Sequence, residues 1–280
     1  MKKILVTVVS LVLCGSLLLG GCGRKGGGEN AEGGASGSAE STAGGEAREA
    51  GTEKVQGIVI EIREGSLVIV PDENSWVRSS SDQVVAGTGA CTDDKSKEAL
   101  AQLAVGDTVE VTFGGSIRES YPAGLDDVTA LRLVSRTAEE KKPSVLVFTG
   151  DGGLTRFVLR ASGYSLTWPK NDKENEGVEA CGIGPLDEQA EKFGGYRVAE
   201  DEFAVTASCG WPVEKIRYQR WSIDSIGSYD AAPLEEGEFS AGEEITLLAG
   251  SAYGFHAEFE TFEGISGNAD YILILRAAEN

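Results

Sequence analysis

The chain has 280 residues, of which 41% are hydrophobic, and a formal net charge of −20 at pH 7. Nucleic acids and anionic lipid head groups are bound mainly by Lys and Arg side chains that neutralise phosphate, so this charge excludes nucleic acid as a partner. Cations, sugars and basic proteins remain open as ligands, and acidity by itself also keeps an exported protein soluble.

The first 22 residues begin with basic side chains, continue with an apolar stretch and end with small residues before a cysteine. Two lysines precede an apolar stretch from Ile4 to Leu19, and two glycines precede Cys22. This is the order of a secretory signal peptide with its cleavage site. The alternative is a transmembrane helix, but the stretch is shorter than the ~20 apolar residues that such a helix needs and is interrupted by serine and glycine.

The sequence Leu-Gly-Gly-Cys at the end of this segment resembles the lipobox of bacterial lipoproteins. The resemblance implies that residues 1–21 are removed and that the Cys22 thiol carries diacylglycerol. Two or three acyl chains hold a protein durably at a bilayer. We therefore expect a protein anchored by lipid to the extracytoplasmic face of the cell membrane.

Residues 23–52 consist mainly of Gly, Ser, Ala and Glu and contain no aromatic residue. Such a segment cannot bury enough apolar surface to fold, so we expect a disordered tether that reaches about 30 Å. The lysines of the first segment offset the acidic excess of this tether. The net charge therefore falls on residues 53–280.

Five cysteines are present. Cys14 would leave with the signal peptide and Cys22 would be acylated, which leaves Cys91, Cys181 and Cys209. Three is odd, so at least one stays unpaired within the chain. Outside the cytoplasm a bridge is chemically allowed, and Cys181 with Cys209 is the favoured pair because both lie in the second module. The alternative is buried free thiols that pack as small hydrophobes.

Residues 53–136 form a first module with short strands and one short helix. Strand-like runs cover 55–62, 67–70, 107–113 and 128–134, and helical spacing covers 95–103. Val109, Val111 and Phe113 alternate with polar neighbours, which is typical of a half-buried strand. This pattern predicts a small OB-like β-barrel.

Within this module, a Gly-Asp strand start is followed by a glycine, an aliphatic residue and the run Glu-Ser-Tyr-Pro-Ala. The arrangement resembles the YobA-like domain of Gram-positive lipoproteins, at Gly106, Asp107, Val109, Val111, Gly115, Ile117, Glu119, Ser120, Tyr121, Pro122 and Ala123. The resemblance covers most of the module and implies an OB-type fold and an extracytoplasmic location, but no reaction. A longer insert at 86–97 departs from the family pattern.

The Glu119–Ala123 run is a strand end that enters a turn, because Pro122 removes a backbone donor and makes Tyr121 extended. Tyr121 with Glu119 could line a ligand groove at the barrel mouth. The favoured alternative is that Tyr121 plugs the barrel, since aromatic side chains usually serve packing.

After a charged linker at 137–142, residues 143–280 form a second module of many short strands separated by turn residues. The runs cover 144–149, 155–161, 163–169, 203–209, 215–223, 244–250, 253–260 and 271–277. This pattern of short strands separated by turn residues predicts an antiparallel Ig-like β-sandwich. The runs GYSLTWP, ACGIGPLD and YGFHAEFETFEGISGNADYILIL resemble a C-terminal Ig-like module of other Gram-positive lipoproteins, with no function implied.

Two aromatic stripes in this module are expected to form its core. They are Tyr164, Leu166 and Trp168, and Tyr253, Phe255, Ala257 and Phe259. The functional alternative is a carbohydrate platform of exposed Trp211, Tyr218 and Trp221. Ordinary sandwich packing is favoured, because buried aromatic residues dominate cores.

Catalytic and metal signals are weak. The single histidine, His256, shares its strand face with Glu258 and Glu260 and is expected at the surface. A nucleophilic triad or a zinc site would have to use it. Residues 172–177 superficially resemble the start of an EF-hand loop, but its twelfth position would be Ile183, where an EF-hand needs a bidentate glutamate.

Acidic clusters could still contribute to a calcium site, at 93–94, 126–127 and 200–202. No cofactor is expected, and calcium is the one metal left open.

These features predict a non-enzymatic, membrane-anchored extracytoplasmic lipoprotein with a binding or interaction role, whose partner is a protein or glycan of the cell envelope. The alternative is an envelope hydrolase that uses paired carboxylates. Glu119, Asp126 and Asp127 are the candidates for that role.

The lipid anchor can be tested by metabolic labelling with radioactive palmitate. Cys22→Ala should lose the label and leave the membrane fraction, because the acylated thiol is gone. Cys14→Ala, a cysteine change inside the signal peptide, should keep both. Label that persists in Cys22→Ala would contradict the prediction, as would an intact start methionine on protein recovered from the cytosol.

Overall fold

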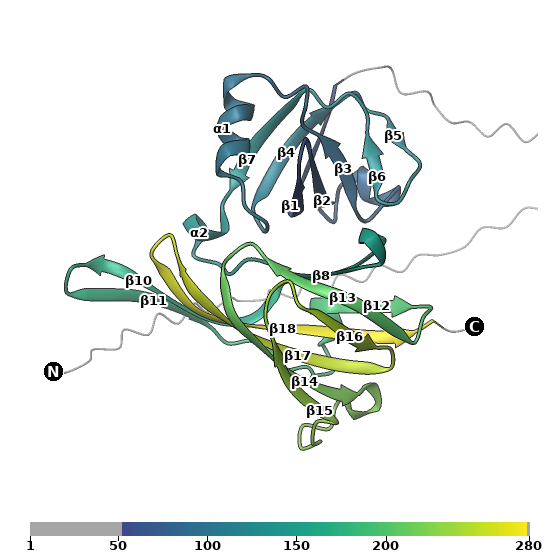
Figure 1. Ribbon diagram of the computed structural model, residues 1–280, viewed down its shortest axis with the longest axis vertical. Helices are drawn as coiled ribbons and strands as arrows, with labels where there is room; N and C mark the ends of the chain where they lie inside the picture. The colour runs from purple at the N-terminus through teal and green to yellow at the C-terminus, as the bar shows by residue number, and fades with distance from the viewer. Residues whose placement is uncertain (1–51, 279–280) are drawn as a thin grey trace, which may run out of the picture. The chain divides into compact units, whose positions relative to one another are not determined.

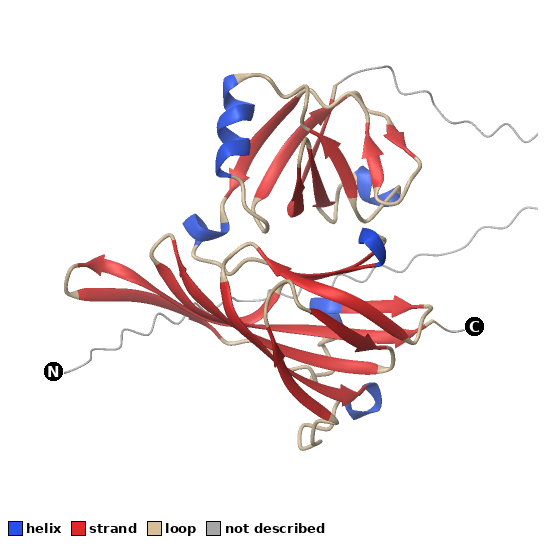
Figure 2. Cartoon of the chain, viewed as in Figure 1, coloured by secondary structure: helices blue, strands red, loops and turns tan. Residues whose placement is uncertain are grey.

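A computed structural model describes residues 52–278 of the chain (Figure 1). The predicted signal peptide, the lipid attachment at Cys22 and the tether, except for its last residue, lie outside the described residues. Within 52–278 the strands form three sheets, and most neighbouring strands are antiparallel (Figure 2). The prediction of a mainly β fold is confirmed. Every helix of this part is too short or too polar to cross a bilayer.

The first sheet is built from residues 53–135. Its strands are β1 (Glu53–Arg63), β2 (Ser66–Pro71), β3 (Val84–Gly87), β4 (Thr108–Phe113), β5 (Ile117–Arg118), β6 (Ala123–Leu125) and β7 (Ala130–Ser135). In hydrogen-bonded order they run β5-β6-β3-β2-β1-β4-β7. The neighbours are antiparallel except for β3 and β6, which are parallel. A 3-10 turn, η1 (Trp76–Ser79), lies between β2 and β3.

This sheet is open. The prediction that residues 53–136 form a closed barrel is therefore wrong, although the strands themselves are present. β6 pairs with β3 and β7 pairs with β4. Between β6 and β7, Asp127 has φ of 50°, and its neighbours bond to the end of β4: Gly114 N–H donates to the Asp126 carbonyl oxygen and Thr129 N–H donates to the Thr112 carbonyl oxygen, both at 2.9 Å. Among the described strands, β5 and β7 remain the two edges of the sheet. Its core remains apolar, with Val59, Val109 and Phe113 fully buried.

The predicted helix at 95–103 is confirmed as α1 (Asp94–Gln102), which packs on β7. Asp93 caps it by accepting a hydrogen bond from the Ser96 backbone N–H at 3.2 Å. The bonds from Ser96 lower the pKa of Asp93 to about 2. The Ser96 hydroxyl also accepts a bond from the Leu131 N–H at 3.0 Å, which fixes the helix to β7.

The second module is a sandwich of two sheets, as predicted. The larger sheet has the order β11 (Glu174–Ala180), β10 (Ala161–Asn171), β18 (Ile265–Ala277), β17 (Ser251–Phe262), β14 (Val213–Ser222) and β15 (Glu235–Phe239), and β12 (Gly195–Val198) pairs with β18. The smaller sheet has the order β16 (Glu244–Leu248), β13 (Glu202–Cys209), β8 (Leu146–Gly150) and β9 (Thr155–Leu159). Short helical turns are α2 (Thr137–Glu140), η2 (Asp151–Gly153), α3 (Glu191–Gly194) and η3 (Ile223–Ser225).

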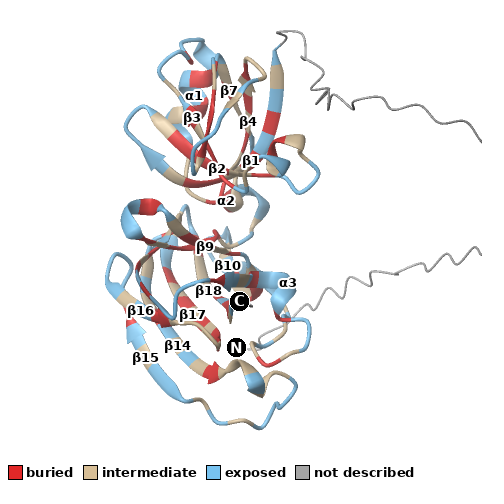
Figure 3. Ribbon diagram, turned by 90° about the vertical axis from the view of Figure 1, so that its right-hand side faces the viewer, coloured by how far each residue is buried: buried red, intermediate tan, exposed pale blue. Residues whose placement is uncertain are grey.

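The facing sides of the two sheets hold the predicted aromatic core, and the buried residues of their strands are red in Figure 3. Phe148 of β8 packs on Phe255 of β17 with ring centroids 4.8 Å apart. The stripe from Tyr253 to Phe259 is buried at its alternate positions, and Leu166 is buried between the partly buried Tyr164 and Trp168. The core prediction is confirmed.

The alternative of an exposed aromatic platform is wrong for both of its tryptophans. Trp211 is 1% exposed and Trp221 is 8% exposed. Trp211 packs edge-on against Phe259 with ring centroids 5.2 Å apart, and Tyr218 is partly buried against the same core. These aromatic side chains pack because burial of their large apolar area is favourable.

Asp107 connects the first sheet to the segment expected to be a linker at 137–142. Its carboxylate is 1% exposed and accepts hydrogen bonds from the backbone N–H groups of Ala104 at 2.9 Å and Thr137 at 3.0 Å. Thr137 begins α2, and its hydroxyl accepts a bond from Trp211 Nε1 at 3.0 Å. Burial raises the pKa of Asp107, and the hydrogen bonds oppose that rise.

An aliphatic cluster joins the outer side of the first sheet to the smaller sheet of the sandwich. Ile60 and Val68 pack with Val145 and Val147, and all four are buried. The described residues, 52–278, lie within one compact unit. The two modules are therefore held by shared apolar burial as well as by the polar contacts of Asp107.

This shared burial predicts joint unfolding. Ile60→Ala should lower the free energy of unfolding by about 2–5 kcal/mol, because it leaves a cavity in the cluster. The melting temperature should fall, and both modules should still unfold in one transition. Calorimetry and tryptophan fluorescence would measure this. The matched control is Ile62→Ala on the same strand, where the side chain is 47% exposed and the expected change is about 0.5 kcal/mol or less. Two separate transitions in Ile60→Ala would contradict the prediction.

Candidate functional site

The β17–β18 hairpin places a histidine and a carboxylate side by side. Its turn has two residues, Glu263 and Gly264, with φ of 51° and 81°, as the turn type that suits strand twist requires. The resulting register pairs His256 with Asp270 and Phe255 with Tyr271. Since side chains alternate across a strand, the aromatic pair enters the core and the polar pair lies on the outer face.

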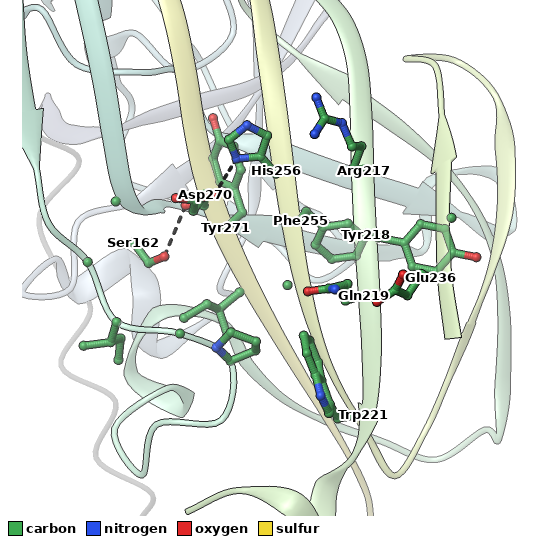
Figure 4. A pocket seen from close by; sticks show the side chains of 18 residues that line it. Ser162, Arg217, Tyr218, Gln219, Trp221, Glu236, Phe255, His256, Asp270 and Tyr271 are labelled. Atoms are coloured by element: carbon green, nitrogen blue, oxygen red, sulfur yellow. Dashed lines mark hydrogen bonds and ion pairs between the residues drawn. The ribbon is translucent and has the colours of Figure 1, made fainter. Parts of the chain in front are cut away.

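Two neighbouring strands continue this polar outer face. Arg217 of β14 lies opposite His256, and Gln219 lies opposite Gly254. On the next strand, β15, Glu236 lies opposite Gln219. Figure 4 shows these side chains around one pocket, with Asp270 and Glu236 toward its two sides.

A cavity of about 610 Å³ lies over this part of the sheet. The segment that follows β11 contributes Gly182, Ile183, Gly184 and Pro185 to its wall. Pro185 lies directly against Gly254, because a Cβ added to Gly254 would sit 3.1 Å from Pro185 Cγ. A side chain at Gly254 would push this wall away from the sheet, so glycine is needed for the close approach.

The charged and amide side chains of the pocket form pairs, by hydrogen bond or ion pair, with side chains on neighbouring strands. His256 Nδ1 and Asp270 Oδ1 are 2.7 Å apart. Because an ionised carboxylate only accepts, Nδ1 donates this bond and Nε2 is the ring nitrogen available to a ligand. Gln219 Nε2 donates to Glu236 Oε1 at 2.7 Å, and Arg217 pairs with Glu258.

The opposite end of the pocket is apolar. Ile183, Trp221 and Ile272 line it. Ile272 is buried with Ala252 and Ile274, and Ile183 packs against them. The Trp221 indole N–H donates to the Ala231 carbonyl oxygen at 3.0 Å, which fixes the ring. The pocket therefore combines hydrogen-bonding groups with a fixed apolar surface, as small-molecule sites commonly do.

The predicted groove residues lie elsewhere. Glu119 is exposed and Tyr121 is 47% exposed, both between β5 and β6. The interpretation of Tyr121 as a barrel plug is therefore wrong. Partial burial, followed by the charge of Asp82, raises the pKa of Tyr121 to about 12. Neither Glu119 nor Tyr121 lines the 610 Å³ cavity.

The hydrolase and calcium candidates do not gather into a site. Asp126 pairs with Arg118 at 2.8 Å, and Asp127 occupies the break between β6 and β7. Asp93 is used as the cap of α1. Among residues 52–278, no three His, Cys, Asp or Glu side chains come together in a way that could hold a metal ion.

The three cysteines of the described residues are free thiols, so no bridge joins Cys181 to Cys209 in the structure. Cys91 is buried, Cys209 is partly buried and Cys181 is exposed. Burial raises the pKa of the Cys209 thiol to about 11. Cys181 lies next to the pocket wall in sequence, immediately before Gly182.

Comparisons of the chain with protein-family models, with curated proteins and with solved structures find no match. The class of ligand therefore has to be inferred from the side chains that line the pocket. Sequence patterns had placed His256 on the outer face with Glu258, and this is confirmed by its alternation with buried Phe255. Its bonding partner Asp270 and its cross-strand neighbour Arg217 were missed, because their proximity depends on strand register.

The pairing of His256 with Asp270 predicts one histidine tautomer. His256 is the single histidine of the chain, so its two ring nitrogens can be followed in a long-range nitrogen–proton NMR spectrum. In the neutral ring Nδ1 should carry the proton, because it donates to Asp270. Asp270→Ala should shift the population toward the Nε2–H form. A wild-type ring with its proton mainly on Nε2 would contradict this geometry.

Proposed function

We propose that the chain is a lipid-anchored, extracytoplasmic binding protein and that the pocket over β14, β17 and β18 is its ligand site. The signal segment and Cys22 support the anchor, and the tether would hold the folded part close to the membrane. The observation that supports the binding site is the cavity of about 610 Å³ with polar pairs at one end and an apolar surface at the other. Ligand pockets commonly measure about 300–1,000 Å³.

Binding is favoured over hydrolysis by the positions of the pocket carboxylates. Asp270 lies on β18 and Glu236 on β15, with β17 and β14 between them. Three strand spacings and an offset of two residues along the strands put their Cα atoms about 16 Å apart. In a glycoside hydrolase the two carboxyl groups themselves are about 5–9.5 Å apart. Each carboxylate here is also bonded to another side chain, Asp270 to His256 and Glu236 to Gln219, so the pair is better placed to hold a ligand than for acid–base attack on one glycosidic bond.

A serine nucleophile is equally poorly supported. Ser162 lines the pocket, but its hydroxyl donates to the Asp270 backbone oxygen at 3.3 Å. A catalytic serine instead needs a hydrogen bond to its base. His256 and Asp270 therefore serve better as hydrogen-bonding groups for a bound ligand, which would come from the cell envelope or from outside it.

The pocket can be tested by filling it. Gly184 lines the cavity, and a Cβ there meets nothing within 4 Å, so Gly184→Trp should place a large ring at the wall of the pocket and block ligand entry without a clash in the fold. The matched control is Gly89→Trp, because Gly89 also lies in a loop with open space around it and is not part of the lining.

The measurement is a thermal-shift screen of the acylated protein in detergent against sugars, amino acids, amines, nucleosides and organic acids. A ligand at about 100 times its Kd stabilises the folded state by about 2.7 kcal/mol, or roughly 5–10 °C for a chain of this size. Wild type and Gly89→Trp should show the shift, and Gly184→Trp should not. Shifts that persist in Gly184→Trp would place the ligand elsewhere, and no shift with any compound would contradict the proposal.

A further inference from the structure

The chemistry of the pocket narrows the class of ligand. Assuming that the cavity is a binding site, as proposed above, we infer that it takes a neutral saccharide. Three observations lead to this conclusion: the balance of charge in the lining, the distribution of donors and acceptors over the floor, and the apolar end beside Trp221.

The charge balance disfavours an anionic ligand. The lining carries two carboxylates, Asp270 and Glu236, one arginine, Arg217, and one histidine, His256, which is paired with Asp270. Arg217 already pairs with Glu258 on the neighbouring strand. A phosphate or carboxylate in the cavity would therefore meet two like charges and a cation whose charge is already compensated.

A cationic ligand is disfavoured by the distance between the carboxylates. An ammonium group is compact, and Asp270 and Glu236 project from strands about 14 Å apart, so it could contact only one of them. The Asp270 side chain is 56% exposed and is paired with His256. A single ion pair at such an exposed position is weak.

The floor instead offers donors and acceptors side by side. His256 Nε2, the second oxygen of Asp270 and the remaining atoms of the Gln219 amide are available, because each pair uses only one atom of each partner. A hydroxyl group both donates and accepts, so it can bond to either kind of atom. Several hydroxyls on one rigid ring could span this floor and bond to more than one pair together.

The apolar end suits the other surface of a sugar ring. Ile183, Pro185 and Trp221 lie beside the floor, and the indole is held by its bond to Ala231. A pyranose presents C–H groups on its faces and hydroxyls around its edge. One ring could thus cover Ile183 and Pro185, which are partly exposed, and touch the small exposed part of Trp221, while its hydroxyls reach Gln219 and Asp270.

The inference can be tested with sugars that share one ring and differ in charge. For the gluco, galacto and manno series, the ligands are the neutral hexose and its N-acetylhexosamine, the cationic hexosamine and the anionic uronate. Isothermal titration calorimetry on the acylated protein should show binding of a neutral member. The amine and the uronate of the same series should bind at least tenfold more weakly.

Gln219→Leu should weaken the neutral sugar at least tenfold, because it removes both the donor and the acceptor of the amide. Asn268→Leu is the matched control, since Asn268 lies on the same face two residues before Asp270 and does not line the cavity. It should bind as wild type does. Gln219→Met provides a second variant, in case the leucine variant unfolds; it keeps the length of the side chain and the charge of the lining, removes the amide, and should weaken the neutral sugar to a similar extent.

The outcomes separate this inference from the proposed function. Tighter binding of the amine or the uronate would overturn the neutral-saccharide assignment and leave the site in place. The same holds if another class of compound binds in a manner that Gly184→Trp abolishes, while no sugar binds. If no compound of any class binds, both conclusions fall.

Discussion

The register between β17 and β18 is the constraint on which both the core and the pocket depend. It places Phe255 opposite Tyr271 in the interior and His256 opposite Asp270 on the outer face. A shift of one residue would exchange these faces, because side chains alternate along a strand. If β18 slipped in this way, Asp270 would turn into the core, Tyr271 would turn outward and the bond between His256 and Asp270 would be lost, so the stability of the sandwich also maintains the geometry of the pocket.

The pocket is therefore built on a rigid support. β17 and β18 are flanked on both sides by paired strands, and their inner residues belong to the largest buried cluster. The smaller sheet is in turn joined to the first module through Val145 and Val147. Asp107 adds a buried carboxylate whose desolvation is offset by hydrogen bonds from Ala104 and Thr137. A preorganised surface of this kind lowers the entropy lost when a ligand binds.

The wall of the pocket depends on close backbone approach more than on large side chains. Gly254 allows Pro185 to lie against the sheet, and a Cβ on Gly182 would come within 1.8 Å of the Ser162 carbonyl oxygen. These contacts hold the segment after β11 near the strands that it covers. The polar floor and the apolar end can then contact one ligand together.

Local patterns in the sequence determined the mainly β fold, the helix near residue 95, the aromatic stripe from Tyr253 to Phe259 and the outward position of His256. These features follow from periodicity and helix-forming residues, which act over a few neighbouring positions. The opening of the first sheet and the exposure of Tyr121 were not predictable in this way.

Only the tertiary structure decided that His256, Asp270, Arg217 and Glu236 share one cavity. They come from four strands, and their proximity depends on which strands pair and in which register. Alternation assigns each side chain to a face of its own strand but does not specify its neighbours across the sheet. The sequence by itself therefore determined which residues face outward, and long-range strand pairing decided which of them meet.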